Sequence, residues 1–213
     1  MTTYKDILKD DYIINLYNDI EEKTNYVISH GLQHVKNVLS FCKQLANVFS
    51  LSNQKRKLLY IACLLHDVGR NIDNKTHNEE SVKFAQKYLK NKISINNLHI
   101  ISDAIFYHST ESSDFTKMDD IAYILLLSDK LDILDKRLLP NLLYQANSSH
   151  FDLYKACKKI DIQLQNNYLI FNFYSNNNNL KNLIENMWHN KIKIILYSFV
   201  SHFKLNGYIF NFV

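Results

Sequence analysis

Glycine and proline are scarce in this chain of 213 residues, which contains three glycines and a single proline, Pro140. Because β-sandwiches and β-barrels usually use glycine and proline in their turns, this scarcity favours long helices. Hydrophobic residues make up 46% of the chain, enough to bury a substantial core as one domain, with or without a small appendage. The composition therefore predicts a mainly α-helical protein.

Disulfide patterns, basic clusters and long hydrophobic segments are also lacking. The three cysteines, Cys42, Cys63 and Cys157, are too widely spaced for a disulfide framework or a CxxC zinc site, so we expect reduced core residues and a cytoplasmic location. The net charge of +4 is spread without a dense Lys/Arg block, which disfavours a nucleic-acid partner. Residues 1–20 mix Lys and Asp with apolar residues, so we expect neither a signal peptide nor a membrane span.

Apolar residues recur at spacings of three and four through the first two thirds of the chain, which is typical of amphipathic helices. Thr76 and Glu79 are predicted to form a capping box at the start of one of them, and Pro140 to end or kink the last. The helices are predicted over residues 3–22, 31–49, 52–65, 76–89, 95–107 and 118–139.

The period changes to two after about residue 145. Alternating apolar residues over 160–164 and 169–173 flank Asn166 and Asn167, which predicts a β-hairpin. A helix over 180–203 and a strand over 208–213 complete a small ββαβ unit. We therefore expect a helical domain over residues 1–145 and an α+β subdomain over 146–213. Its aromatic residues are expected to form a core, or alternatively an exposed sheet for a homodimer or for base stacking.

The apolar run from Ile61 to Leu65 ends in His66 and Asp67, two side chains that are costly to bury unpaired. Neighbouring helical residues point about 100° apart, so the pair can share a cation only near a helix end. Gly69 predicts such an end through a left-handed turn, after which Arg70 leaves toward solvent or a phosphate. The alternative is a buried histidine followed by an N-capping aspartate.

Other candidate metal ligands lie near the ends of apolar helices. His34 stands near the start of the helix over 31–49, four residues after His30, for which a surface or capping role is expected. Asp129 follows a strongly apolar run. Together with His66 and Asp67, they form a nitrogen and oxygen set suited to divalent Mn, Fe, Co, Ni or Zn, with Mg also considered. An octahedral ion held by these four would keep two positions open for water and substrate.

The motifs around these residues resemble those of the HD-domain metal-dependent phosphohydrolase superfamily. HGLQHVKNV (30–38) is similar to the opening helix of that superfamily, LLHDVGR (64–70) to its central motif and LSDKLD (127–132) to its closing one. The resemblance covers about residues 28–137 and implies a helical HD bundle. It also implies one or two divalent ions, with His34, His66, Asp67 and Asp129 as ligands.

Two more segments resemble a subset of the superfamily. The helix from His77 to Ala85 and the segment AIFYHS, which contains His108, are similar to those of bacterial HD proteins that symmetrically cleave dinucleoside tetraphosphates. In that subset these histidines face the phosphates or a second metal ion. The Ser-Asp-Lys segment and the C-terminal subdomain depart from the subset. Asn71-Ile72-Asp73 replaces the Glu-Asp motif of alarmone hydrolases, which disfavours guanosine tetraphosphate as substrate.

The predicted function is hydrolysis of a phosphate ester or phosphoanhydride, in a nucleotide or another small phosphorylated metabolite, by a metal-activated water. Asp67 would also orient the water, and His77 and His108 would complete a second metal site or bind and protonate phosphate oxygens. The residues expected to neutralise phosphate charge are Arg70, Lys130 and Arg137. Two alternatives stay open, a nucleotide-sensing module without turnover and a nuclease that uses the same ion.

Overall fold

A computed structural model describes residues 3–24, 27–109, 115–139 and 149–213. The chain divides into two compact units. Unit 1 comprises Met1–Thr24 and His30–Asp129, and unit 2 comprises Asn25–Ser29 and Lys130–Val213. The predicted domain boundary between residues 145 and 146 and the predicted helix end at Pro140 lie outside the described residues. Within the described part of the chain, no helix is both long and apolar enough to cross a membrane.

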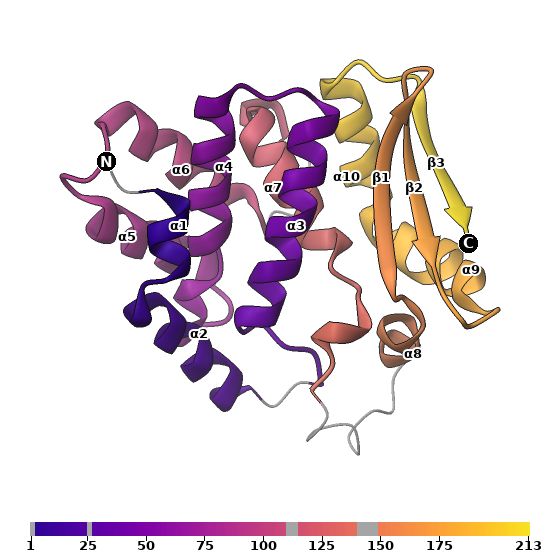
Figure 1. The fold of residues 1–213 in the computed structure, drawn as a ribbon, viewed down its shortest axis with the longest axis horizontal. Helices are drawn as coiled ribbons and strands as arrows, with labels where there is room; N and C mark the ends of the chain where they lie inside the picture. Colours follow the sequence, from indigo (N-terminus) through magenta and orange to yellow (C-terminus); the bar gives the residue numbers. More distant parts are fainter. Residues whose placement is uncertain (1–2, 25–26, 110–114, 140–148) are drawn as a thin grey trace. The chain divides into compact units, whose positions relative to one another are not determined.

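Unit 1 is helical, and its central element is a helix whose residues from Leu58 to Leu65 are all buried. This helix, α4, runs beside α3 (Figure 1). Because apolar side chains surround α4 on every side, it can only lie among other helices, as its sequence predicts. The elements of unit 1 are α1 (Tyr4–Leu8), α2 (Asp11–Lys23), α3 (Leu32–Val48), α4 (Asn53–Leu65), η1 (Val68–Asn71), α5 (His77–Leu89), α6 (Ile95–Tyr107), η2 (Phe115–Lys117) and most of α7 (Asp120–Leu131).

Three predictions about the helices differ from the structure. The predicted helix over 3–22 is broken between α1 and α2, where the side chain of Asp10 accepts a hydrogen bond from the backbone N–H of Tyr12 (2.9 Å). The predicted capping box at Thr76 is wrong, because the hydroxyl of Thr76 donates to Oδ2 of Asp73 (3.1 Å) and does not cap α5. Helix α7 ends at Leu131, eight residues before the predicted end at 139, and a 3₁₀ turn, η3 (Asp135–Arg137), follows.

Unit 2 is an α+β structure in which the predicted ββαβ order is confirmed. Strands β1 (Lys159–Gln165) and β2 (Tyr168–Tyr174) form an antiparallel hairpin, and β3 (Gly207–Phe212) pairs with β2 in parallel. The hairpin turns at Asn166 and Asn167, both with positive φ (51° and 63°), as two-residue hairpin turns require. The helical segment between β2 and β3 comprises α9 (Leu180–Leu183), a π-helical turn (Ile184–Trp188) and α10 (His189–His202).

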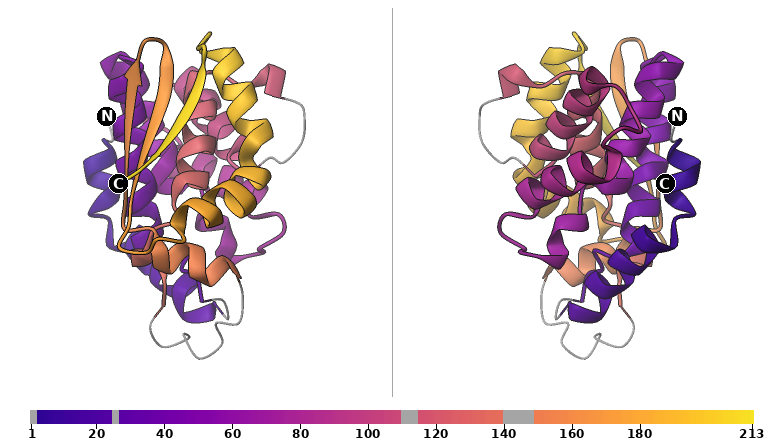
Figure 2. Two further views of the ribbon diagram at one scale, coloured as in Figure 1. Left: turned by 90° about the vertical axis from the view of Figure 1, so that its right-hand side faces the viewer. Right: turned by 90° about the vertical axis from the view of Figure 1, so that its left-hand side faces the viewer.

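Aromatic side chains form the core between this segment and the sheet. The indole of Trp188 lies 5.7 Å from the ring of Phe173 and 5.9 Å from that of Phe210, measured between ring centroids. Helix α10 lies along one face of the sheet (Figure 2). The prediction of an aromatic core thus agrees with the structure, whereas α8 (Ser149–Ala156), which precedes β1, was not predicted.

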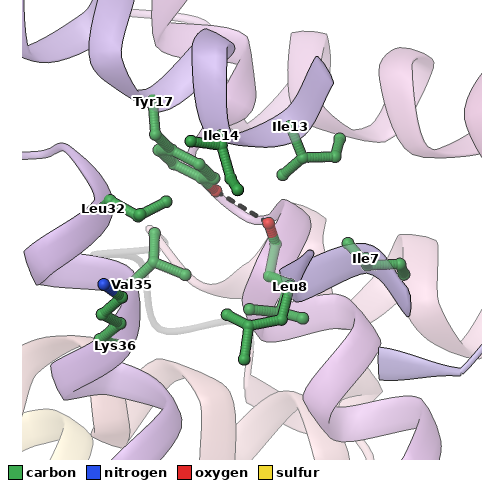
Figure 3. A pocket seen from close by; sticks show the side chains of 9 residues that line it. Ile7, Leu8, Ile13, Ile14, Tyr17, Leu32, Val35 and Lys36 are labelled. Atoms are coloured by element: carbon green, nitrogen blue, oxygen red, sulfur yellow. Dashed lines mark hydrogen bonds between the residues drawn. The ribbon is translucent and has the colours of Figure 1, made fainter. Parts of the chain in front are cut away.

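Helix α2 braces the part of unit 1 that carries the His66-Asp67 doublet. The hydroxyl of Tyr17 donates to the carbonyl oxygen of Leu64 (3.0 Å) at the edge of an apolar pocket (Figure 3). The side-chain amide of Asn71 donates to the carbonyl oxygen of Leu16 (2.7 Å). The pocket contains none of the predicted site residues. The N-terminal helices therefore hold the end of α4 and the η1 turn in place.

Gly69 lies in η1, where the backbone comes very close to the backbone at the start of α5. Its φ is not positive, so the predicted left-handed turn is wrong. The backbone N–H of Gly69 donates to the hydroxyl of Ser81 (2.8 Å), and an added Cβ would collide with the carbonyl oxygen of His77 and lie 2.5 Å from the backbone nitrogen of Ser81. Only glycine lets η1 touch the first turns of α5, which places His77 near the doublet.

We expect the Gly69→Ala variant to lower the free energy of unfolding by about 1–3 kcal/mol, because backbone atoms must shift to admit the methyl group. Chemical denaturation followed by circular dichroism would measure the loss. Gly31→Ala is the matched control, since the three atoms nearest to a Cβ there all belong to the side chain of Glu21 and none belongs to the backbone. Its expected loss is below about 1 kcal/mol. Equal losses in the two variants would contradict this account.

Candidate metal centre

Four side chains from three helices converge in unit 1. His34 lies in the first turns of α3, His66 and Asp67 follow the last residue of α4, and Asp129 lies on α7. The Nε2 atom of His34 is 3.3 Å from Nε2 of His66 and 3.1 Å from Oδ1 of Asp129. The Oδ2 atom of Asp67 is 3.6 Å from Nε2 of His34 and 3.8 Å from Nε2 of His66. The structure thus brings together all four predicted metal ligands.

These separations suit one cation. Ligand atoms about 2.1 Å from a zinc-sized ion lie about 3.0–3.4 Å apart in octahedral or tetrahedral arrangements. The break in the helix makes the convergence possible, because His66 keeps a helical backbone whereas Asp67 has φ −110° and ψ 2°. The two neighbouring side chains therefore turn toward the same point, as expected for a doublet at a helix end.

A second group of donors meets the other oxygen of the same carboxylate. Oδ1 of Asp67 lies 3.5 Å from Nε2 of His77, in the first turn of α5, and 3.3 Å from Nε2 of His108, just after α6. The two Nε2 atoms are 3.2 Å apart. Asp67 therefore faces two donor groups, with Oδ2 toward His34 and His66 and Oδ1 toward His77 and His108.

Backbone hydrogen bonds fix the tautomers of three of these histidines. Each Nδ1 atom lies close to the carbonyl oxygen three residues earlier, at 2.7 Å for His66, 2.8 Å for His77 and 2.5 Å for His108. A carbonyl only accepts, so Nδ1 carries the proton of the neutral ring and Nε2 presents a lone pair. Lone pairs that face one another across 3.2 Å repel unless a cation lies between them.

The surroundings of Oδ1 of Asp67 also indicate a cation at this site. It is buried and has no hydrogen-bond partner among the described residues, since the Nε2 atoms near it carry no proton. An unpaired carboxylate oxygen surrounded by imidazole lone pairs is costly in the absence of a positive charge. The donor set therefore fits a divalent cation, by the chemistry of its atoms as well as by their spacing.

The protonation states are also those that metal binding needs. Burial lowers the pKa of His66 to about 3 and that of His77 to about 4, so both rings are uncharged at neutral pH. Burial by itself raises the pKa of Asp67, but the guanidinium of Arg70 and the hydrogen bond with Nδ1 of His30 hold that pKa well below its ordinary value. Neutral imidazoles and an ionised carboxylate can coordinate without first losing protons.

Arg70 and His30 complete the surroundings of Asp67. The Nε atom of Arg70 donates to Oδ2 of Asp67 (2.7 Å), and Nη2 of Arg70 lies 3.2 Å from Nε2 of His77. Nδ1 of His30 is 3.1 Å from Oδ2 of Asp67. The expectation of a surface or capping role for His30 is therefore wrong. Helical spacing could not have placed it at the site, because it precedes Gly31, the N-cap of α3.

Arg137 and Lys130 differ from the other predicted site residues. The guanidinium of Arg137 is buried in unit 2, where Nε donates to the carbonyl oxygen of Ser29 (2.7 Å) and Nη1 to that of Asp132 (2.9 Å). These contacts give Arg137 a structural role, and its role in substrate binding stays a prediction. The carbonyl oxygen of Lys130 accepts a hydrogen bond from the indole of Trp188 (2.9 Å), and the catalytic role of its side chain stays a prediction.

Comparisons with known proteins agree with this arrangement. Residues 31–135 match the family model of the HD domain. A similar solved structure is that of a predicted HD superfamily hydrolase from an uncultured Thermotogales bacterium. It is 23% identical, with a TM-score of 0.47, and the match covers 58% of this chain and 68% of that one. None of the curated proteins compared with the chain matches it. The family match thus supports membership of residues 31–135 in the HD-domain superfamily.

We expect the metal-free protein to lose stability as the pH falls from 7.5 to 5.5. In the unfolded chain His66 and His77 take up protons near pH 6.5, whereas in the folded protein they resist protonation down to about pH 3 and about pH 4. Unfolding then binds protons, and each histidine lowers the free energy of unfolding by about 1.4 kcal/mol at pH 5.5. Chemical denaturation at the two pH values would measure the difference.

The double variant His66→Asn with His77→Asn is the control for this prediction. It removes both titrating rings while keeping polar side chains of similar size, so its stability should depend much less on pH over the same interval. The lowered pKa of Asp67 does not interfere, because its effect on stability begins only below about pH 4. A double variant as sensitive to pH as the natural protein would show that other groups carry the effect.

Proposed function

We propose that this protein is a metal-dependent phosphohydrolase that cleaves a phosphate ester or phosphoanhydride in a nucleotide or another small phosphorylated metabolite. The main support is the Asp67 carboxylate, which presents one oxygen to each of two donor groups. Paired metal sites that clamp a phosphoryl group are a recurring solution for its hydrolysis. The match of residues 31–135, which include Asp67, to the HD domain is a second support for this proposal.

His34, His66, Asp67 and Asp129 would hold the first divalent ion. The second would be held by Asp67, His77 and His108. Bound ions supply a nucleophilic water at neutral pH and stabilise negative charge on phosphate oxygens. Because most of these donors are imidazole nitrogens, we favour Mn, Fe, Co, Ni or Zn over Mg, which prefers oxygen ligands.

The remaining roles follow from the contacts of each side chain. Arg70 offers planar N–H donors that suit phosphate oxygens, and its side chain is 17% exposed beside the two donor groups. His77 is uncharged at neutral pH, with its Nδ1 proton held by the carbonyl of Asn74. It can therefore coordinate through Nε2 but has no proton there to give to a leaving group. These properties favour a ligand role for His77 over a general-acid role.

We further propose a substrate with several phosphates, such as a dinucleoside polyphosphate. The segments that carry His77 and His108 resemble those of the symmetrical tetraphosphatase subset, and both histidines lie beside Asp67. The modest and dispersed positive charge of the chain supports a small substrate over a polynucleotide. A homodimer through unit 2 and a cytoplasmic location stay predictions.

The Asp67→Asn variant tests the proposed reaction. Product formation would be followed by chromatography in the presence of Mn, Co, Ni, Fe, Zn or Mg. The substrates would be dinucleoside tetraphosphates, whose symmetrical cleavage gives two nucleoside diphosphates, and nucleoside mono-, di- and triphosphates. We expect kcat to fall by at least about 100-fold, because even groups that only support a ligand cost 10- to 100-fold when they are lost. Circular dichroism would check that the variant still folds.

Asp161→Asn is the matched control. Asp161 lies on β1 in unit 2 and pairs with Lys159 (2.6 Å), so its loss should leave turnover unchanged. If the natural protein formed no cleavage product from any of these substrates with any of these ions, and nucleotides nevertheless raised its melting temperature, the result would contradict hydrolysis. It would favour the nucleotide-sensing alternative.

A further inference from the structure

The side chain of Arg70 occupies atoms that a metal ion would need. Its Nε atom donates to Oδ2 of Asp67 (2.7 Å), which faces the first donor group. Its Nη2 atom donates to Nε2 of His77 (3.2 Å), which belongs to the second donor group. The guanidinium thus supplies a positive charge and two N–H groups to the acceptors that a cation would otherwise satisfy.

The two contacts differ in their consequence for metal binding. Arg70 and His30 both approach Oδ2 of Asp67, but His34, His66 and Asp129 would remain to hold the first ion without that oxygen. A neutral imidazole has only one acceptor nitrogen, and the Nδ1 proton of His77 is already given to the carbonyl of Asn74. While Arg70 donates to His77, that histidine cannot bind a metal ion.

The first donor group does not depend on this contact. His34, His66 and Asp129 keep their nitrogen and oxygen atoms within 3.1–3.8 Å of one another, and no described contact joins them to Arg70. The second group consists only of Asp67, His77 and His108, so the loss of one donor leaves two. Arg70 therefore opposes the second ion far more strongly than the first.

We propose that Arg70 is an internal competitor of the second metal ion, and that this ion binds only when Arg70 leaves His77. The released guanidinium then becomes available to a phosphate group of the substrate. Arg70 lies on the short η1 turn, and the residue after the turn, Ile72, is 70% exposed. The side chain of Arg70 therefore has solvent nearby into which it can move. This inference rests on the metal centre of the proposed function and is independent of the reaction.

Isothermal titration of the metal-stripped protein with Mn²⁺ alone tests the proposal. We expect the natural protein to bind one ion tightly and a second one weakly. In the Arg70→Ala variant the second ion should bind about 10- to 100-fold more tightly, because a charge-assisted hydrogen bond to His77 no longer has to be broken. Arg70→Lys keeps the charge but lacks the fork that spans both acceptors, so its second affinity should be intermediate.

Two controls separate this competition from a general effect of charge. Lys75→Gln removes an exposed positive charge from the loop before α5 and should leave both affinities unchanged. His77→Asn removes the acceptor and should abolish the second binding event in the natural and the Arg70→Ala backgrounds. Folding of each variant would be checked by circular dichroism, and Arg70→Lys carries the test if Arg70→Ala does not fold.

An unchanged or weaker second affinity in Arg70→Ala or in Arg70→Lys would overturn the proposal. So would binding of a single ion by every variant, although the first metal site and phosphate hydrolysis could then still be correct. Failure of the natural protein to bind any ion would instead refute the metal centre itself. The three outcomes can be told apart from binding data without an activity assay.

Discussion

The buried carboxylate of Asp67 is the constraint on which the rest of unit 1 depends. It stays ionised although it is almost fully buried, and three imidazole nitrogens approach it with lone pairs instead of protons. Arg70 and His30 compensate one of its oxygens, and the other has no partner among the described residues. Such an arrangement is stable only if packing elsewhere holds the helix ends together, which is the role of α2 and of the fully buried end of α4.

The fold class and the four first-group donors could be predicted because their signals are local. An apolar run that ends abruptly in polar residues can be recognised from the sequence, and so can helical spacing and the two-residue hairpin turn. His30 could not be placed in this way. It precedes Gly31, the N-cap of α3, so it lies outside the helix, where the rule of 100° per residue says nothing about direction. Its position depends on the path of the chain into α3.

In the other cases a contact that the local sequence pattern does not reveal decided the outcome. Arg137 is anchored by the carbonyl of Ser29, 108 residues away, and no pattern near Arg137 indicates that partner. Gly69 matters because the first turns of α5 approach it, not because of its own backbone angles. Thr76 had the residue type and spacing of a cap, but Asp73 competes for its hydroxyl. Local sequence indicates which contacts are possible, and the tertiary structure determines which of them form.

The histidines that follow α4 and α6 both form a hydrogen bond to a backbone carbonyl at the end of their helix. Helix C-termini leave carbonyl groups without partners, and Nδ1 of His66 and of His108 meets such groups at Cys63 and Ile105. The hydrogen bond from Nδ1 thus caps the end of the helix and leaves Nε2 as the unprotonated ring nitrogen. No acidic side chain is needed to select the nitrogen that keeps its lone pair, so substitution of a neighbouring side chain should not change that choice. Their readiness to bind metal is a property of the main chain.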